Sequence, residues 1–289
     1  MVLVNGVNFS SEEFHNGEVI FKKPEFISLD RNVIEMYFQN NKDITAVLFA
    51  RQYLTDVSLG VPCDLVMKYC PYERMDREIN NQMFSMKYFA EILGKFDFDT
   101  VYILDPHSDV CVDLLGDVGL KVKIISLEDY VQQVIDDFKP DYICYPDKGA
   151  YHKYPKVLSN IKIPFFFGEK KRDLENKGRI TDYELIGAPD LKDKKALIID
   201  DICCLGGTAY NAATEMKKLG AKEVAFYISH CENGVFAGKI LEKRPLILNG
   251  KETHFTGEDY IIDKVYTADT MLVNQKHENL HIVKSKNIQ

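Results

Sequence analysis

Hydrophobic residues come in short runs along the chain, and amphipathic stretches separate these runs. In the first part of the chain we interpret residues 43–50 and 64–69 as strands, 80–96 as a helix and 99–105 as a strand. Short apolar runs that alternate with helices are typical of a parallel sheet with helices on its faces. The pattern therefore predicts an α/β fold.

A second series of the same kind follows. It consists of a helix over 126–138, strands over 141–147 and 195–201, a helix over 208–220 and a strand over 222–229. Residues 89–107 and 212–230 each give a helix, a short turn, a strand and a final histidine, His107 and His230. The similarity predicts two related α/β halves, 1–125 and 126–289, each with a mainly parallel sheet flanked by helices.

Composition excludes several classes of protein. The 289 residues are 46% hydrophobic, and the formal net charge of -8 disfavours a nucleic-acid partner, which would need clustered Lys and Arg. The seven cysteines form no CxxC pair and mostly lie in apolar runs, as reduced thiols do. Apolar runs are too short to span a membrane. We expect a cytoplasmic protein without a membrane segment.

The most informative stretch is IDDICCLGGT, residues 199–208. Two carboxylates, Asp200 and Asp201, follow a buried strand, and Gly206, Gly207 and Thr208 open a helix. A glycine turn at a helix N-terminus presents backbone amides to a phosphate. The carboxylates accept hydrogen bonds from vicinal sugar hydroxyls, or hold magnesium. The stretch therefore predicts a site for a phosphorylated sugar.

This stretch resembles the phosphoribosyl diphosphate binding motif of type I phosphoribosyltransferases and ribose-phosphate diphosphokinases. Five other segments occur in the order in which the diphosphokinases carry them: FHNGE, CPYERMDRE, YILDPHSD, YPDKGA and GEKKRD. The resemblance covers most of residues 14–235. It implies two type I phosphoribosyltransferase-like domains and transfer of the β,γ-diphosphate of ATP, as co-substrate, to an anomeric ribose hydroxyl.

Arginines supply guanidinium groups suited to polyphosphate oxygens, and Arg74 and Arg77 flank Asp76, which could orient one of them. The resemblance places all three residues at ATP. It also implies that a hairpin with Phe14, Asn16 and Glu18 contacts adenine in a neighbouring subunit. A homo-oligomer, a dimer or a hexamer, is therefore expected.

His107 and Asp147 end strands in different halves, and the resemblance makes them ligands of a Mg²⁺ ion, or Mn²⁺, bound to ATP. His230 then frames the site without binding metal. Residues 168–179 are rich in cations and are predicted to form a mobile loop that closes over the transferred group. The resemblance assigns catalysis to Lys170 and Arg172, and Asp201 or solvent takes the hydroxyl proton.

The sequence departs from the family pattern at Cys204 and Leu205, where an aspartate and a threonine normally help to grip ribose 5-phosphate. Each lost hydrogen bond to a charged group should weaken that grip by about 1 to 3 kcal/mol. The other motifs persist, so we expect a different acceptor, ADP-ribose, whose product would serve NAD resynthesis.

Three alternatives stay open. The first keeps the chemistry and uses ribose 5-phosphate as the acceptor, which makes a phosphoribosyl diphosphate synthetase. The second is a phosphoribosyltransferase, which would not need the arginine segment or the hairpin. The third is a non-catalytic relative that binds nucleotides and regulates a partner.

Overall fold

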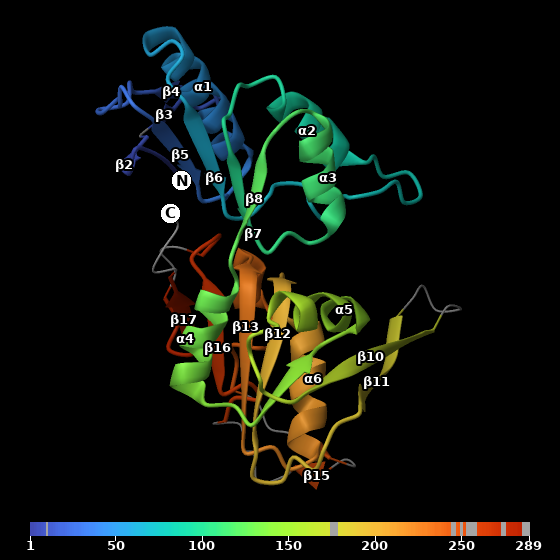
Figure 1. Cartoon of the computed structure of the whole chain (residues 1–289). Helices are drawn as coiled ribbons and strands as arrows, with labels where there is room; N and C mark the ends of the chain where they lie inside the picture. The colour runs from blue at the N-terminus through green and yellow to red at the C-terminus, as the bar shows by residue number, and fades with distance from the viewer. Residues whose placement is uncertain are drawn as a thin grey trace. The chain divides into compact units, whose positions relative to one another are not determined.

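A computed structural model describes residues 1–9, 11–173, 179–243, 247–248, 251–252, 259–272 and 276–284 of the chain. The chain divides into two compact units, Met1–Ser126 (unit 1) and Leu127–Gln289 (unit 2), which Figure 1 shows in blue to green and in green to red. Each unit has its own core of buried apolar side chains.

Unit 1 is built on a six-stranded sheet in the order β2-β1-β5-β6-β7-β8. The strands are β1 (Val2–Val4), β2 (Val7–Asn8), β5 (Asn32–Met36), β6 (Cys63–Met67), β7 (Val101–Leu104) and β8 (Val122–Ile125). Strands β5 to β8 are parallel, and β1 and β2 are antiparallel additions at one edge. A separate hairpin pairs β3 (Ser11–Glu13) with β4 (Val19–Phe21).

The helices of unit 1 are α1 (Asn41–Val57), α2 (Ser85–Leu93) and α3 (Asp109–Asp117). The strand predicted over 43–50 is wrong, because these residues lie inside α1. A capping box between Asn40 and Asp43 starts the helix, and its inner side buries Ala46, Ala50 and Leu54 at helical spacing. The β-branched residues of this stretch favoured a strand locally, and packing against the sheet decided otherwise.

Unit 2 contains a seven-stranded sheet in the order β11-β10-β9-β12-β13-β16-β17. The strands are β9 (Tyr142–Tyr145), β10 (Phe165–Asp173), β11 (Arg179–Ile186), β12 (Lys195–Cys203), β13 (Glu223–Cys231), β16 (Lys264–Ala268) and β17 (Leu280–Val283). Neighbouring strands are parallel except β10 and β11. The small pair β14 (Ile247–Leu248) and β15 (Lys251–Glu252) is separate.

The helices of unit 2 are α4 (Glu128–Phe138), α5 (Lys148–Val157), α6 (Gly207–Lys218) and a 3-10 turn, η1 (Asn233–Ala237). Both units therefore have a mainly parallel sheet flanked by helices, which confirms the predicted α/β class (Figure 1). In the part of the chain that the structure describes, helices are too short or too polar to cross a bilayer.

All seven cysteines are free thiols. Six are buried, and Cys204 is exposed. Burial raises the pKa of the Cys63 thiol to about 11, so this group stays protonated at neutral pH. The buried cysteines therefore pack as small apolar side chains.

Candidate active site

The acidic pair at the end of β12 lies in the middle of the unit 2 sheet. Ile198 of β12 is paired with Cys144 of β9, so Asp201 and Asp147, each three residues further along, end at the same edge. The amide of Asp201 donates to Asp200 Oδ1 at 3.1 Å, near the C-terminal end of β12. The carboxyl edge of a parallel sheet is where ligands of such folds bind.

Helix α6 begins directly after this turn. Gly206 is its N-cap, with φ +75°, and Tyr210 makes the first helical hydrogen bond to the Gly206 carbonyl at 2.9 Å. The amides of Gly207 and Thr208 precede that bond and point out of the helix N-terminus, where an anion is stabilised. The turn thus presents backbone amides suited to an anion, beside two carboxylates.

Close backbone packing against residues 234–240 fixes the path of this turn. A Cβ on Gly206 would lie 2.7 Å from Ile240 Cγ2, and a Cβ on Gly238 would lie 2.1 Å from the Leu205 carbonyl oxygen. Both positions therefore require glycine, Gly206 also for its positive φ. Gly238 and Ile240 were not predicted, because nothing in a single sequence links them to a turn about thirty residues earlier.

The two departures from the family pattern face outward. Cys204 is exposed, and Leu205 has 54% of its surface accessible. An exposed leucine at this point offers no hydrogen bond to a phosphate, and a thiol is a weak donor. The turn keeps its backbone amides and lacks the side chains that would grip a terminal phosphate.

Two further groups support the acidic pair. Lys153 in α5 places its Nζ 4.0 Å from Asp201 Oδ2, at the outer limit of an ion pair. Asp147 caps α5 by accepting a hydrogen bond from the amide of Ala150 at 3.1 Å. Lys153 was not predicted as a site residue.

Buried packing also anchors the ends of β9 and β10. The Tyr183 hydroxyl donates to the Pro146 carbonyl at 2.8 Å, and burial raises the pKa of Tyr183 well above its usual range. A Cβ on Gly168 would lie 1.8 Å from that hydroxyl oxygen, so only glycine fits there. The entry to the cation-rich segment is therefore rigid.

The mobile loop predicted over 168–179 is wrong for most of its length. Residues up to Asp173 continue β10, and β11 starts at Arg179, so the two form an antiparallel hairpin. The backbone of Lys170 is paired with Tyr183, and that of Arg172 with Ile180. Residues 174–178, including the predicted cation Lys177, lie outside the described residues.

In unit 1, the segment after β6 and the segment after β7 are joined by side chains. Arg77 donates from Nε to Asp76 Oδ1 at 2.8 Å and from Nη2 to Asp76 Oδ2 at 3.0 Å. The Ser108 hydroxyl donates to the same Oδ2 at 2.9 Å. The structure thus brings Asp76 and Arg77 together, as predicted from the sequence, and adds Ser108, which was not predicted.

This contact lowers the pKa of Asp76. The pKa is lowered mainly by the hydrogen bonds from Arg77, and to a smaller extent by the hydrogen bond from Ser108 and by the nearby His107. Asp76 is 6% exposed, whereas Arg74, Arg77 and His107 are exposed at the ends of these segments. Exposed guanidinium groups held by a buried carboxylate suit the binding of a polyphosphate.

The β3–β4 hairpin presents the predicted adenine contacts. The Phe14 and Glu18 backbones close the turn, and Asn16 Nδ2 donates to Glu18 Oε2 at 2.7 Å. Phe14 has 54% of its surface accessible. An exposed ring beside an amide and a carboxylate is suited to stack on a purine and bond to its edge.

The predicted magnesium ligands belong to different units, His107 to unit 1 and Asp147 to unit 2. Each offers a donor that suits the role, an exposed imidazole and a carboxylate at a strand end. Within the described residues, His, Cys, Asp and Glu side chains form no group of three or more placed to hold an ion. A metal here would take its remaining ligands from phosphate oxygens and water. His230 is fully buried in β13.

Comparison with known proteins finds relatives for most of the chain. The phosphoribosyl transferase domain family matches residues 122–242. A ribose-phosphate pyrophosphokinase of Pyrococcus abyssi is 25% identical over 240 residues, which cover 83% of this chain and 80% of the relative. The enzyme of that name from Pyrococcus furiosus is 28% identical over 62% of this chain and 61% of its own length.

A similar structure is the phosphoribosylpyrophosphate synthetase from Mycobacterium smegmatis. It superposes with a TM-score of 0.71 at 17% identity, and the match covers 95% of this chain and 85% of that one. At this level of identity the match concerns the fold of the chain.

Proposed function

Because this chain is a homologue of the ribose-phosphate pyrophosphokinases, we propose that it is an ATP-dependent diphosphotransferase. It moves the β,γ-diphosphate of ATP to the anomeric hydroxyl of a ribose that carries phosphate on carbon 5, and it releases AMP. The observation that carries this proposal is the turn after β12, where Asp200 and Asp201 lie beside the glycine-built N-terminus of α6.

The residues of this turn divide the work of holding the acceptor. Asp200 and Asp201 accept hydrogen bonds from the ribose hydroxyls, and Lys153 Nζ lies 4.0 Å from Asp201 Oδ2. The amides of Gly207 and Thr208 receive the 5-phosphate. Asp201 or solvent takes the proton of the anomeric hydroxyl.

The donor is ATP, and its binding is supported by unit 1. Arg74 and Arg77 bind phosphate oxygens, and Asp76 holds Arg77 in position. Phe14, Asn16 and Glu18 contact adenine. The exposed ring of Phe14 supports a homo-oligomer in which the hairpin serves a neighbouring subunit.

Phosphoryl transfer needs positioning and charge stabilisation. The acceptor oxygen forms a bond to the β-phosphorus while the bond from that phosphorus to the oxygen of AMP breaks, with the two oxygens in line. Lys170 and Arg172 of β10 neutralise the charge that develops on the transferred group. A Mg²⁺ ion held by His107 and Asp147 would supply further neutralisation of the ATP phosphates when bound.

Two acceptors fit this chemistry. The names of the curated relatives support ribose 5-phosphate, and this is the first candidate. A specific observation favours a second, ADP-ribose. The exposed Leu205 offers a terminal phosphate no side-chain donor and Cys204 offers only a weak one, whereas the 5-phosphate of ADP-ribose is part of a diphosphate bridge and carries less charge. Its product would be ADP-ribose 1-pyrophosphate, an intermediate for NAD resynthesis.

We also propose that the protein is located in the cytoplasm. Free cysteines, six of them buried, fit the reducing cytoplasm.

The test is an acceptor assay. The purified protein is incubated with Mg²⁺, ATP and either ribose 5-phosphate or ADP-ribose, and AMP and the new pyrophosphate ester are quantified by chromatography and phosphorus NMR. AMP release that depends on one acceptor identifies it. Asp201→Asn should lower turnover at least about a hundredfold, since it removes a carboxylate that contacts the reacting sugar. Asp190→Asn, an exposed change in the same unit, is the matched control.

The assay has outcomes that contradict the proposal. If the protein is folded and binds ATP but forms no AMP with either ribose 5-phosphate or ADP-ribose, the result would point to the non-catalytic alternative. Release of pyrophosphate from phosphoribosyl diphosphate in the presence of a base would point to a phosphoribosyltransferase.

A further inference from the structure

Unit 1 carries a cleft that the proposed reaction does not use. It lies between the segment that follows β4 and the outward side of α1, and its volume is about 310 Å³. This size is at the lower end of the range for small-molecule sites. No residue assigned to ATP, acceptor or metal lines it.

One wall of the cleft is a stripe along α1. Phe49, Gln52, Tyr53 and Asp56 are spaced so that they share one side of the helix, opposite the side that buries Val47 and Leu54. A solvent-facing side of a helix needs only polar residues, yet Phe49 has 57% of its surface accessible. The stripe therefore combines an exposed ring and a second aromatic side chain with two polar groups.

The aromatic rings of the cleft are held in place by one another. Phe9 and Phe21 stack with ring centroids 5.2 Å apart, and Phe21 meets Phe49 edge-on at 5.6 Å. Such contacts limit the rotation of each ring. The rings form a prearranged apolar surface on which a planar ligand such as a nucleic-acid base can stack.

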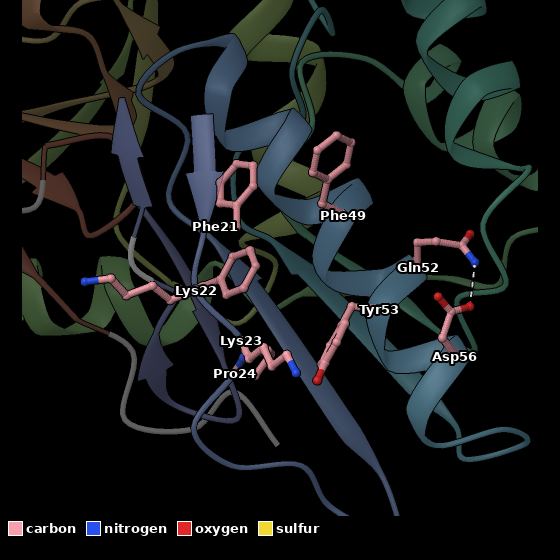
Figure 2. Close-up of a pocket in the computed structure, with 9 residues that line it drawn as sticks. Phe21, Lys22, Lys23, Pro24, Phe49, Gln52, Tyr53 and Asp56 are labelled. Atoms are coloured by element: carbon pink, nitrogen blue, oxygen red, sulfur yellow. Dashed lines mark hydrogen bonds between the residues drawn. The ribbon is translucent and has the colours of Figure 1, made fainter. Parts of the chain in front are cut away.

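The polar groups of the cleft differ in character. Gln52 Nε2 donates to Asp56 Oδ1 at 3.1 Å, which Figure 2 shows as a dashed line. This bond occupies an amide donor, so what the pair offers a ligand is mainly acceptors, Gln52 Oε1 and the Asp56 carboxylate. A ligand group that meets them must donate hydrogen bonds.

The other polar side of the cleft is cationic. Lys22 is paired with Glu12, its Nζ lying 3.1 Å from Oε1. Lys23 also lines the cleft, and within the described ranges it forms no ion pair. An exposed ammonium group at the edge of an aromatic cleft attracts an anion.

We propose that this cleft binds a mononucleotide whose base carries an exocyclic amino group. The base stacks on Phe49 and Tyr53, its amino group donates to Gln52 and Asp56, and its phosphate pairs with Lys23. The combination of an apolar planar surface, acceptors and a cation within one small cleft carries the assignment. It does not depend on the reaction proposed above.

The absence of tryptophan from the chain allows a direct test. Phe49→Trp creates a single fluorophore in the cleft, and cytidine and uridine monophosphates are the probes, because they differ by an amino group in place of an oxo group. We expect cytidine monophosphate to change the emission saturably and to bind at least about fivefold tighter than uridine monophosphate. Lys23→Gln should weaken binding about tenfold while the circular dichroism spectrum stays unchanged.

Controls separate this site from any other. Ile124→Trp places the fluorophore in β8, at the other edge of the unit 1 sheet, and should respond to neither probe. Isothermal titration of the unmodified protein and of Lys23→Gln gives the same comparison if Phe49→Trp does not fold. Three results would overturn the proposal: equal binding of the two probes, no response to either probe at about 10 mM, or emission that depends on protein concentration alone. The third result would mean that a second copy of the protein covers the cleft.

Discussion

The turn after β12 in unit 2 and the segment after β6 in unit 1 are both proposed to bind phosphate, and they are built in different ways. Close packing of glycines shapes the first, with Gly238 against the Leu205 carbonyl and Gly206 against the Ile240 side chain. Charged side chains shape the second, with Asp76 bonded to both Arg77 and Ser108. The turn after β12 depends on positions that have no side chain, whereas the unit 1 segment depends on hydrogen bonds between side chains.

The difference predicts which positions tolerate substitution. In the turn after β12, Gly238 packs against the Leu205 carbonyl, whereas the side chains of Cys204 and Leu205 are exposed. We therefore expect replacement of these two side chains to change ligand preference without moving the backbone. In the unit 1 segment each side chain orients the next, so a substitution there changes geometry and charge together.

The largest effect is expected where backbone packing is broken. Gly238→Ala places a Cβ 2.1 Å from the Leu205 oxygen and 2.9 Å from its carbonyl carbon, so the turn must move. We expect the free energy of unfolding to fall by about 1 to 3 kcal/mol. The acceptor KM should rise about a hundredfold, since a shift of about 1 Å misplaces the bound sugar. Thermal unfolding and acceptor kinetics measure the two effects.

Gly207→Ala is the matched control, because a Cβ there meets nothing within 4 Å and the backbone is not left-handed. Its stability should change by less than about 0.5 kcal/mol. If Gly238→Ala were as stable and active as the parent protein, the claim that backbone contacts hold the turn would be wrong.

The second prediction concerns the side chains that the turn has lost. Cys204→Asp combined with Leu205→Thr restores the residues that the resembling family carries. The hydroxyl introduced by Leu205→Thr donates a hydrogen bond to the charged phosphate, which contributes about 1 to 3 kcal/mol, and the carboxylate introduced by Cys204→Asp accepts one from a sugar hydroxyl. The kcat/KM ratio of ribose 5-phosphate over ADP-ribose should therefore rise about tenfold to a hundredfold, with unchanged thermal stability. The same ratio before and after the exchange would show that these positions do not select the acceptor.

The part of this architecture that depends on local pattern could be predicted. The alternation of apolar runs and helices gave the α/β class, and the acidic pair with its glycines located the turn after β12. The arginine segment and the hairpin turn were also found, because each is a short contiguous motif. In these motifs, residues that are close in the sequence are also close in the folded protein.

The rest depends on contacts between distant segments. Ser108 contacts Asp76, and Gly238 contacts Leu205, each across about thirty residues, so neither pair could be inferred from one sequence. Residues 43–50 were taken for a strand because they form a short, mainly apolar run with three β-branched residues, whereas the capping box of Asn40 starts a helix. Residues 168–173 were taken for a loop because their charge hid the continuation of β10.

A smaller effect is expected in unit 1. Asp76→Asn removes the charge that holds Arg77 and leaves an amide of the same size. We expect the KM for ATP to rise about tenfold while the acceptor KM stays within about twofold, since the change acts on the donor. Asp113→Asn in α3 of the same unit is the control. An equal rise in both KM values would show that Asp76 supports the fold rather than ATP.

The smallest effect concerns Ser108 and is seen in the pH dependence. Hydrogen bonds with Arg77 and Ser108 lower the pKa of Asp76 in the folded protein. This carboxylate therefore contributes stability above its unfolded pKa of about 3.9. The contribution is lost as the pH falls through the lower folded pKa. Ser108→Ala removes one donor, so the pKa should rise toward the ordinary value and the loss should begin at higher pH. NMR titration of the Asp76 carboxyl carbon measures this shift, with Ser85→Ala as the control.

In Ser108→Ala, ATP affinity at neutral pH should fall by about threefold or less, because Arg77 still holds the carboxylate. An unchanged pKa in Ser108→Ala would mean that Arg77 alone sets the charge of Asp76, and that the two segments of unit 1 are independent.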